Sequence, residues 1–392
     1  MTAPTAPTRG RPERRPAWTW LLPALSVALA LGIPFLVWYG ADAILESTDG
    51  TISDPVTDPA APGYEVIVNP SPSHMVLSLD PAGDLTMVSI LSLGSNDIGG
   101  TVLHLSPETV LPNNPNFDRI VDVYREHGPD RTRRVVARLL NINVDEMTVL
   151  DAAAWTQLVE PAGAIPVDIT EDLVRVDNGE TTTIYAAGNV TVEPFATSEF
   201  LGWVNPGEHP GSRMERHLAF WDAWMASIIA SDDPGIVPGE VDSGIGRFLR
   251  GLARGVLVMP EPVTEQVTLT SGVPAVEVSI DELRDLVTAM IPFPLPPAEG
   301  ARPRTKLLDG VGGLDLPGEY SPPLVREGAQ VVVLGNAFPE FGVERTVVIY
   351  HDPSWEEEAF AFSKALGGAS VEFEPVRDVV FDITVIIGED QR

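Results

Sequence analysis

The residues from Pro16 to Ala41 include no charged side chain. The core of this stretch, 18–40, is long and apolar enough to cross about 30 Å of hydrocarbon as a helix. Four arginines precede the stretch, and because arginine favours the cytoplasmic side of a membrane, we expect the short tail inside and the rest of the chain outside. The alternative is a cleaved signal peptide with its site at Ala41-Asp42-Ala43, although the apolar region exceeds the roughly 7–15 residues of such peptides.

The composition excludes several classes of protein. Apolar residues make up 44% of the 392 residues, so the chain is not largely disordered and has enough apolar surface for two cores. Cysteine is absent, which excludes thiol catalysis, thiolate metal sites and disulfides. The formal net charge is −31, and a field of this sign repels phosphate backbones, so nucleic acid is not an expected partner.

The chain divides into five expected parts. Residues 1–17 are a cytoplasmic tail, 18–40 a transmembrane helix and 41–64 a linker, followed by a large domain over 65–296 and a small domain over 303–392. A proline-rich segment over 291–297, which cannot continue a helix, separates the two domains. Strands alternate with helices in both, so we expect two α/β domains.

Apolar runs and helical periodicity predict the elements of these domains. In the large domain we expect strands at 75–79, 85–93, 101–105, 147–150 and 165–169 and helices at 132–140, 152–160 and 214–229; in the small domain, strands at 330–334, 346–350 and 379–387 and a helix at 355–366.

Arginines are unevenly distributed in this acidic chain. Arg134 and Arg138 lie on one side of the helix expected at 132–140, and Arg213 and Arg216 lie one turn apart where the next long helix begins. A helix N-terminus favours anions, and arginine forks match phosphate oxygens, so these residues form a candidate phosphate or pyrophosphate site. The alternative is that they lie on solvated helix faces and pair with the many carboxylates of the chain.

Other catalytic patterns are weak. The six histidines lack the spacing of zinc ligands, and no nucleophile elbow, Walker loop or dinucleotide fingerprint occurs. The glycine run at 310–313 is expected in a loop that does not join a strand to a helix, so it is a weak candidate for a cofactor loop.

Several segments together resemble the LytR-CpsA-Psr family. The stretch from Ala137-Arg138-Leu139-Leu140-Asn141-Ile142 to Gly163-Ala164-Ile165-Pro166-Val167 is similar to the centre of that family, and Gly211-Ser212-Arg213-Met214-Glu215-Arg216 resembles its later Gly-Arg-x-x-Arg motif. Residues 303–392 resemble the small LytR C-terminal-type domain often attached to these proteins, through Val331-Val332-Val333-Leu334-Gly335-Asn336 and Val385-Ile386-Ile387-Gly388.

The resemblance implies a function at the cell wall. The family binds a polyprenyl-pyrophosphate-linked glycopolymer and transfers it to peptidoglycan; arginines hold the pyrophosphate, aspartates hold Mg²⁺, and an apolar tunnel takes the lipid. Carried over, Arg213 and Arg216, with Arg134 and Arg138 behind them, would bind pyrophosphate, and Asp84 would be the metal ligand after a one-residue slip.

The chain departs from the family pattern at two prolines. Pro107 replaces the key arginine of the family's Ser-Ile-Pro-Arg-Asp-Thr motif, and Pro210 replaces the acidic residue before Gly-Arg-x-x-Arg. Three hypotheses follow: an active glycopolymer transferase, a relative with impaired catalysis that binds the lipid-linked polymer, or an envelope scaffold without catalysis. The prolines favour the second hypothesis over the first, and the retained pair Arg213 and Arg216 favours it over the third.

Overall fold

The computed structural model describes residues 56–112, 118–208, 210–375 and 380–392, and Thr57–Arg392 form one compact unit. The expected tail 1–17, the expected membrane helix 18–40 and most of the linker 41–64 lie outside the described residues. None of the helices in the described part is long and apolar enough to span a bilayer.

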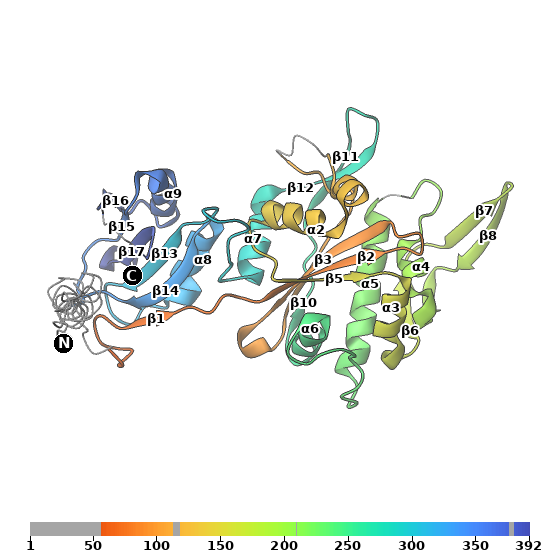
Figure 1. Ribbon diagram of the computed structural model, residues 1–392, viewed down its shortest axis with the longest axis horizontal. Helices are drawn as coiled ribbons and strands as arrows, with labels where there is room; N and C mark the ends of the chain where they lie inside the picture. Colours follow the sequence, from red (N-terminus) through yellow and green to blue (C-terminus); the bar gives the residue numbers. More distant parts are fainter. Residues whose placement is uncertain (1–55, 113–117, 209, 376–379) are drawn as a thin grey trace, which may run out of the picture. The chain divides into compact units, whose positions relative to one another are not determined.

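A five-stranded mixed sheet carries the larger part of the fold (Figure 1). Its order is β10-β4-β3-β2-β5, from β2 (Ser73–Leu79), β3 (Leu85–Leu93), β4 (Gly100–Leu105), β5 (Glu146–Leu150) and β10 (Leu257–Val258). β3 pairs antiparallel with β2 and β4, while β5 is parallel to β2 and β10 is parallel to β4. Every residue of β2 and β3 is buried, which confirms the strands expected from continuous apolar runs.

Helices cover both faces of this sheet. On one face, Val76 and Leu91 join an apolar cluster with residues of α3 (Ala152–Val159), α4 (Thr197–Gly202), α5 (Pro210–Ile229) and α6 (Gly244–Ala253). On the other face, Leu77 and Ile90 pack with α2 (Ile120–Leu140) and α7 (Ile280–Met290). The result is a three-layer α/β/α arrangement, in agreement with the expected mixed α/β class.

Helix α2 begins twelve residues before the helix expected at 132–140, and it is kinked near its middle. Gly128 has a φ of 72°, and Pro129 follows it inside the helix. Proline lacks the N–H that would continue the hydrogen-bond ladder of a helix, so a helix was not expected to run through Pro129. The helical periodicity therefore predicted only the second half of α2.

Three two-stranded antiparallel sheets complete this region. They are β6 (Ile165–Ile169) with β9 (Gly188–Val192), β7 (Leu173–Asp177) with β8 (Glu180–Tyr185), and β11 (Thr264–Thr268) with β12 (Pro274–Val278).

The C-terminal residues form a six-stranded sheet in the order β1-β14-β13-β17-β15-β16. Its strands are β1 (Glu65–Ile67), β13 (Arg304–Asp309), β14 (Gln330–Asn336), β15 (Val347–Tyr350), β16 (Ser370–Phe373) and β17 (Ile383–Ile387). Helix α8 (Ser321–Arg326) lies between β13 and β14 in the chain, and α9 (Glu356–Ala365) lies between β15 and β16. The sequence gives no sign of one pairing: β1, from the start of the chain's globular part, adds antiparallel to β14. At Gly335 of β14 a Cβ would lie 2.4 Å from the Tyr64 carbonyl oxygen, so this close pairing requires glycine.

A buried arginine ties the segment between the two sheets to the C-terminal end of α2 on one side and to the residues around α8 on the other. Arg302 is 5% exposed; its Nε donates to the Asn141 carbonyl at 2.7 Å and its Nη1 to the carbonyls of Val325 and Ala329 at 3.2 and 2.8 Å. Burial lowers the pKa of this guanidinium to about 10, so it stays charged at neutral pH. The C-terminal end of α2 is thereby joined to the residues around α8 and β14.

We expect Arg302→Ala to lower the free energy of unfolding by at least about 2 kcal/mol, because three carbonyls, two of them buried, lose a charged donor. Urea unfolding of the full chain measures this change. Arg284→Ala is the matched control, because that arginine is 53% exposed and pairs with Asp281 one turn away. Equal stability of the two variants would show that Arg302 does not hold the sheets together.

Candidate functional site

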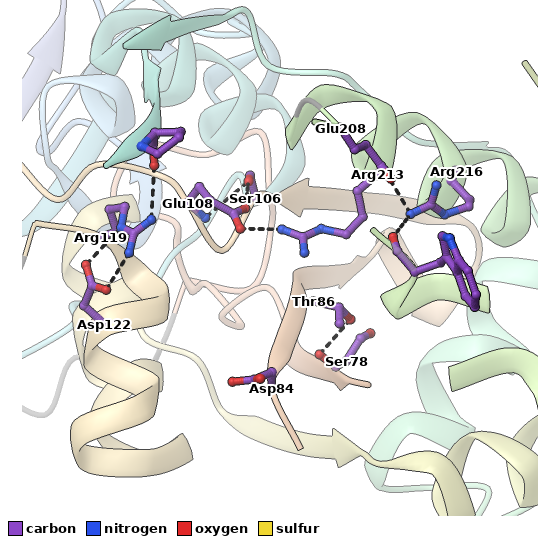
Figure 2. A network of polar contacts seen from close by, with 12 residues as sticks. Ser78, Asp84, Thr86, Ser106, Glu108, Arg119, Asp122, Glu208, Arg213 and Arg216 are labelled. Carbon is purple, nitrogen blue, oxygen red and sulfur yellow. Dashed lines mark hydrogen bonds and ion pairs between the residues drawn. The ribbon is translucent and has the colours of Figure 1, made fainter. Parts of the chain in front are cut away.

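The predicted pyrophosphate site lies where the loop after β4 meets the start of α5 (Figure 2). Ser106 and Pro107 of this loop are buried, and the Pro107 carbonyl accepts a hydrogen bond from Val121 of α2 at 2.8 Å. The loop is also paired with β12, since the Glu108 carbonyl accepts from Val276 at 3.0 Å. The site therefore rests on fixed backbone.

Arg213, in the first turn of α5, forms an ion pair with Glu108 of this loop. Its Nη2 donates to Oε1 of the carboxylate at 2.5 Å, and Ser106 Oγ donates to Oε2 at 2.7 Å. The Arg213 and Glu108 side chains are only 12% and 18% exposed. Burial raises the pKa of the Glu108 carboxyl, but the Arg213 charge and the bonds from Arg213 and Ser106 outweigh this effect and hold the pKa below its usual value. Glu108 is thus ionised at neutral pH and neutralises Arg213.

Arg216 is paired more deeply. Its Nη2 donates to Glu208 Oε1 at 3.1 Å and to the Trp203 carbonyl, and the arginine and glutamate side chains are 5% and 2% exposed. The other oxygen of Glu208 accepts from the Asn205 backbone at 2.5 Å, so the carboxylate holds the turn before α5 as well. Burial lowers the pKa of the Arg216 guanidinium, and Glu208 opposes that shift. This pair is an internal element of the fold.

The other candidate arginines are not brought to this point. Arg134 and Arg138 are exposed on α2. Arg119, which is not one of the candidates, lies at the start of α2 and donates twice to Asp122, at 3.0 and 2.8 Å, and once to the Pro274 carbonyl at 3.1 Å. Of the four residues predicted to bind pyrophosphate, the structure therefore gathers only Arg213 and Arg216 near one loop.

Asp84, the predicted metal ligand, lies in the turn between β2 and β3. It is 53% exposed, and its carboxylate contacts Arg125 Nε at 3.4 Å. No group of three or more His, Asp or Glu side chains suited to a metal ion occurs among the described residues. Magnesium needs several oxygen ligands, so the described residues do not fit a preformed magnesium site at Asp84.

The hollow next to Arg216 is small and acidic. Its volume is about 80 Å³, and Asp168, Glu171 and Glu215 are among its lining residues. Ligand pockets usually have volumes of roughly 300–1,000 Å³. This hollow is therefore smaller than a usual ligand pocket, and the apolar cavity expected in front of the arginines stays a prediction.

Aromatic side chains instead fill the interior behind the arginines. Trp155, Trp221 and Trp224 are each 0% exposed, with ring centroids 5.2 to 6.2 Å apart. His104 of β4 packs against Trp221 at 5.5 Å, and its Nδ1 shares a hydrogen bond with Ser89 Oγ at 2.8 Å. Burial lowers the pKa of His104 to about 3, and the pKa of His217 falls well below 6.5 through burial and the nearby charges of Arg216 and Arg213. Both imidazoles are neutral.

The glycine run at 310–313 differs from the expectation in the elements that it connects. It joins β13 to a helical segment that begins at Leu316, so it does connect a strand to a helix. The Asp309 carboxylate accepts hydrogen bonds from the backbone N–H groups of Val311, Gly312 and Leu314 at 2.7 to 2.9 Å. A carboxylate of the chain itself thus occupies the donors that would otherwise hold a phosphate.

Residues 68–193 match the LytR_cpsA_psr family. The match confirms the resemblance inferred from the sequence, and it covers Asp84, Pro107, Arg134 and Arg138 but ends before Arg213. A search of curated proteins gives no match.

Several solved structures are similar to the chain. TagV of B. subtilis is 12% identical, with a TM-score of 0.46, and the similarity covers 57% of this chain and 97% of TagV. A transcriptional regulator of Enterococcus faecalis is 14% identical, with a TM-score of 0.44, and the similarity covers 56% of this chain and 86% of the regulator. The LytR-CPS2A-psr family protein YwtF (TagT) with bound octaprenyl pyrophosphate lipid is 13% identical, with a TM-score of 0.42. This similarity covers 61% of this chain and 92% of YwtF.

Glu108 and Glu208 determine the character of the site, and no motif in the sequence marks them as partners of the arginines. The sequence feature that points to such partners is the excess of acidic residues, 56 Asp and Glu against 25 Lys and Arg. With this excess, each arginine is expected to have a carboxylate partner. The alternative that the arginines pair with carboxylates is correct for Arg213 and Arg216, but these pairs are buried and do not lie on a solvated face.

We expect Glu208→Ala to destabilise the protein by about 3–5 kcal/mol, because Arg216 would be left as an unpaired buried charge. Thermal or urea unfolding measures the loss. Glu199→Ala is the control, since its pair with Arg175 is half exposed and such pairs contribute little. A loss below 1 kcal/mol at Glu208 would mean that Arg216 finds solvent when its partner is removed.

Stability should fall as the pH is lowered from about 6.5 toward 4. The pKa of His104 is lowered to about 3 and that of His74 to about 4 in the folded protein, so the unfolded chain binds more protons throughout this interval. Each histidine then contributes a slope of up to about 1.4 kcal/mol per pH unit, and its stabilisation is complete above 6.5.

Urea unfolding at pH 7.5, 6.0 and 5.0 measures this slope. His104→Leu removes one buried titrating group and should make the dependence shallower, whereas His127→Gln, at a position 44% exposed, should leave it unchanged. A free energy of unfolding that stays constant across these three pH values would contradict the neutral buried histidines.

Proposed function

We propose that the protein is an extracytoplasmic cell-envelope protein, anchored by residues 18–40, that binds a polyprenyl-pyrophosphate-linked glycopolymer and is impaired in transferring it to peptidoglycan. The family match over 68–193 supports the class of protein. Residues 303–392, which supply five of the six strands of the second sheet, would be the attached LytR C-terminal-type domain.

The ion pair between Arg213 and Glu108 is the observation that carries this proposal. Phosphoryl transfer depends on positive charge placed against the pyrophosphate, since positioning and charge neutralisation supply most of the catalysis. Here one arginine position is occupied by Pro107, and the two remaining arginines each have a glutamate partner. The charge available to stabilise a transition state is therefore largely cancelled.

Binding survives this cancellation better than transfer does. Pyrophosphate carries more negative charge than one carboxylate, and the Arg213–Glu108 pair keeps 12% and 18% of its side-chain surface exposed. A pyrophosphate can therefore compete with Glu108 for the Arg213 fork. Arg216 cannot be reached in the same way, because Glu208 beside it is 2% exposed.

An envelope scaffold without a lipid ligand is the second candidate, and the filled interior favours it. Trp155, Trp221 and Trp224 occupy the space behind the arginines and are fully buried. A prenyl chain would have to displace packed aromatic side chains, each of which contributes several kcal/mol when buried.

Binding of geranylgeranyl pyrophosphate to the full chain in detergent distinguishes the two candidates. We expect Glu108→Gln to tighten binding by about tenfold or more, because it frees Arg213 for a charge-assisted bond, and Arg213→Gln to weaken it by a similar factor. Glu199→Gln, at an exposed pair, is the control and should change nothing.

The outcome separates the hypotheses cleanly. If neither the parent nor Glu108→Gln binds the probe, the ligand-binding function fails and the scaffold replaces it. Efficient transfer of a lipid-linked polymer to peptidoglycan by the parent protein would overturn the impaired catalysis.

A further inference from the structure

Two arginines of α6 and a third just after its end line a hollow at the end of β4 opposite to Glu108. Arg247, Arg250 and Arg254 are three and four residues apart, so they share one face of the helix. The hollow has a volume of about 330 Å³, and its wall is completed by Asp97, Val241, Asp242 and Gly251. Glu108 lies beyond the C-terminal end of β4, whereas Asp97 lies before its N-terminal end. The hollow is therefore at the opposite end of the strand from the site at Arg213.

The charge of these arginines is not cancelled as it is at Arg213 and Arg216. Arg247 does form a two-bond pair with Asp97, with both distances 3.0 Å. Arg250, however, donates to main-chain carbonyls, those of Val237, Gly239 and Glu240, at 2.5 to 3.0 Å, and no carboxylate partner of it is found in the described part of the chain.

Arg254, at the end of α6, is exposed, and no hydrogen bond or ion pair of its side chain is found within the described ranges. The lining therefore has three guanidinium groups against the two carboxylates of Asp97 and Asp242. In a chain of net charge −31, this is a place where an anion is attracted.

Glycines and a constrained turn build the wall of the hollow. A Cβ at Gly251 would lie 2.9 Å from the Asp97 carbonyl oxygen, and one at Gly255 would lie 2.7 Å from Gly99 N, so α6 can approach the turn only with glycine at both positions. Asn96 and Asp97 both have positive φ, 58° and 57°, which is uncommon outside glycine. The bonds from Asp97 to Arg247 hold this turn in place, so the hollow is preformed.

A larger groove of about 770 Å³ adjoins the hollow and shares Asp97 and Arg247 with it. Its lining mixes hydrogen-bonding side chains such as Asn69, Asn96 and Thr101 with apolar surface from Met290 and Phe293. This mixture suits a sugar ring, which offers hydroxyl groups at its edge and C–H groups on its faces.

We propose that this region is a second binding site, specific for a phosphorylated saccharide, with the phosphate against Arg250 and Arg254 and the sugar in the adjoining groove. Arginine forks match phosphate oxygens in geometry and charge, which fits the arginine end of the hollow. The proposal goes beyond the pyrophosphate-binding function, because it uses none of the residues near Glu108 and can hold or fail independently.

Calorimetric titration of the full chain in detergent with glucose 1-phosphate tests the site, with glucose and inorganic phosphate as comparison ligands. Arg254→Gln should weaken binding of glucose 1-phosphate by about tenfold or more, through loss of a charge-assisted bond. Asp242→Asn should tighten it several-fold, because the carboxylate that opposes the phosphate is removed. Both residues are exposed, so neither substitution disturbs the core. The opposite directions exclude misfolding as the common cause.

Arg284→Gln, an exposed arginine on α7, is the control and should leave the affinity unchanged. Glucose should bind at least tenfold more weakly than glucose 1-phosphate. The proposal is overturned if the parent does not bind glucose 1-phosphate, or if Arg254→Gln and Asp242→Asn leave the affinity unaltered. Inorganic phosphate binding as tightly as glucose 1-phosphate would overturn the role of the sugar groove.

Discussion

Burial of the five-stranded sheet on both faces is the constraint on which the rest of the structure depends. Because β2 and β3 have no exposed residue, their side chains are almost wholly committed to packing. Polar side chains that could act on a ligand are therefore placed where strands end. One such place is the loop after β4, with Glu108 facing α5, and the other is the turn before β4, with Asp97 facing α6. The two candidate sites follow from this geometry.

The same packing explains the state of the first site. Apolar residues of α3, α4, α5 and α6 cover one face of the sheet, and the buried interior extends to the first turns of α5. Arg216 and His217 lie at that boundary. An unpaired guanidinium would be costly there, so Arg216 is matched by Glu208, and His217 stays neutral. The pairing that weakens the site as an anion binder is thus what allows these residues to be buried.

Local sequence pattern predicted those parts of the fold that local physics determines. The strand at 85–93 is found with its expected bounds, because a long apolar run between turns has few alternatives. The first half of α2 was missed because the Gly128-Pro129 pair interrupts the periodicity that identifies a helix. The pairing of β1 with β14 depends on contacts between residues about 270 apart, and no local pattern reports such a contact.

The site was predicted only in part for a related reason. Periodicity placed Arg213 and Arg216 correctly at the start of a helix, but it could not reveal Glu108, which reaches Arg213 from more than one hundred residues away. The arginines of α6 carried a readable signal, because 247, 250 and 254 have helical spacing with apolar residues between them.

The difference between the two ends of β4 comes from the kind of acceptor that each arginine meets. At the α5 end the acceptors are carboxylates, which supply a full negative charge and cancel the positive one. At the α6 end Arg250 meets carbonyl groups, which satisfy its donors and leave its charge in place. Hydrogen-bond satisfaction and charge neutralisation are separate quantities, and an arginine can have the first without the second. In a chain with 56 acidic residues, an arginine that is hydrogen-bonded but not neutralised is the one that remains able to attract an anionic ligand.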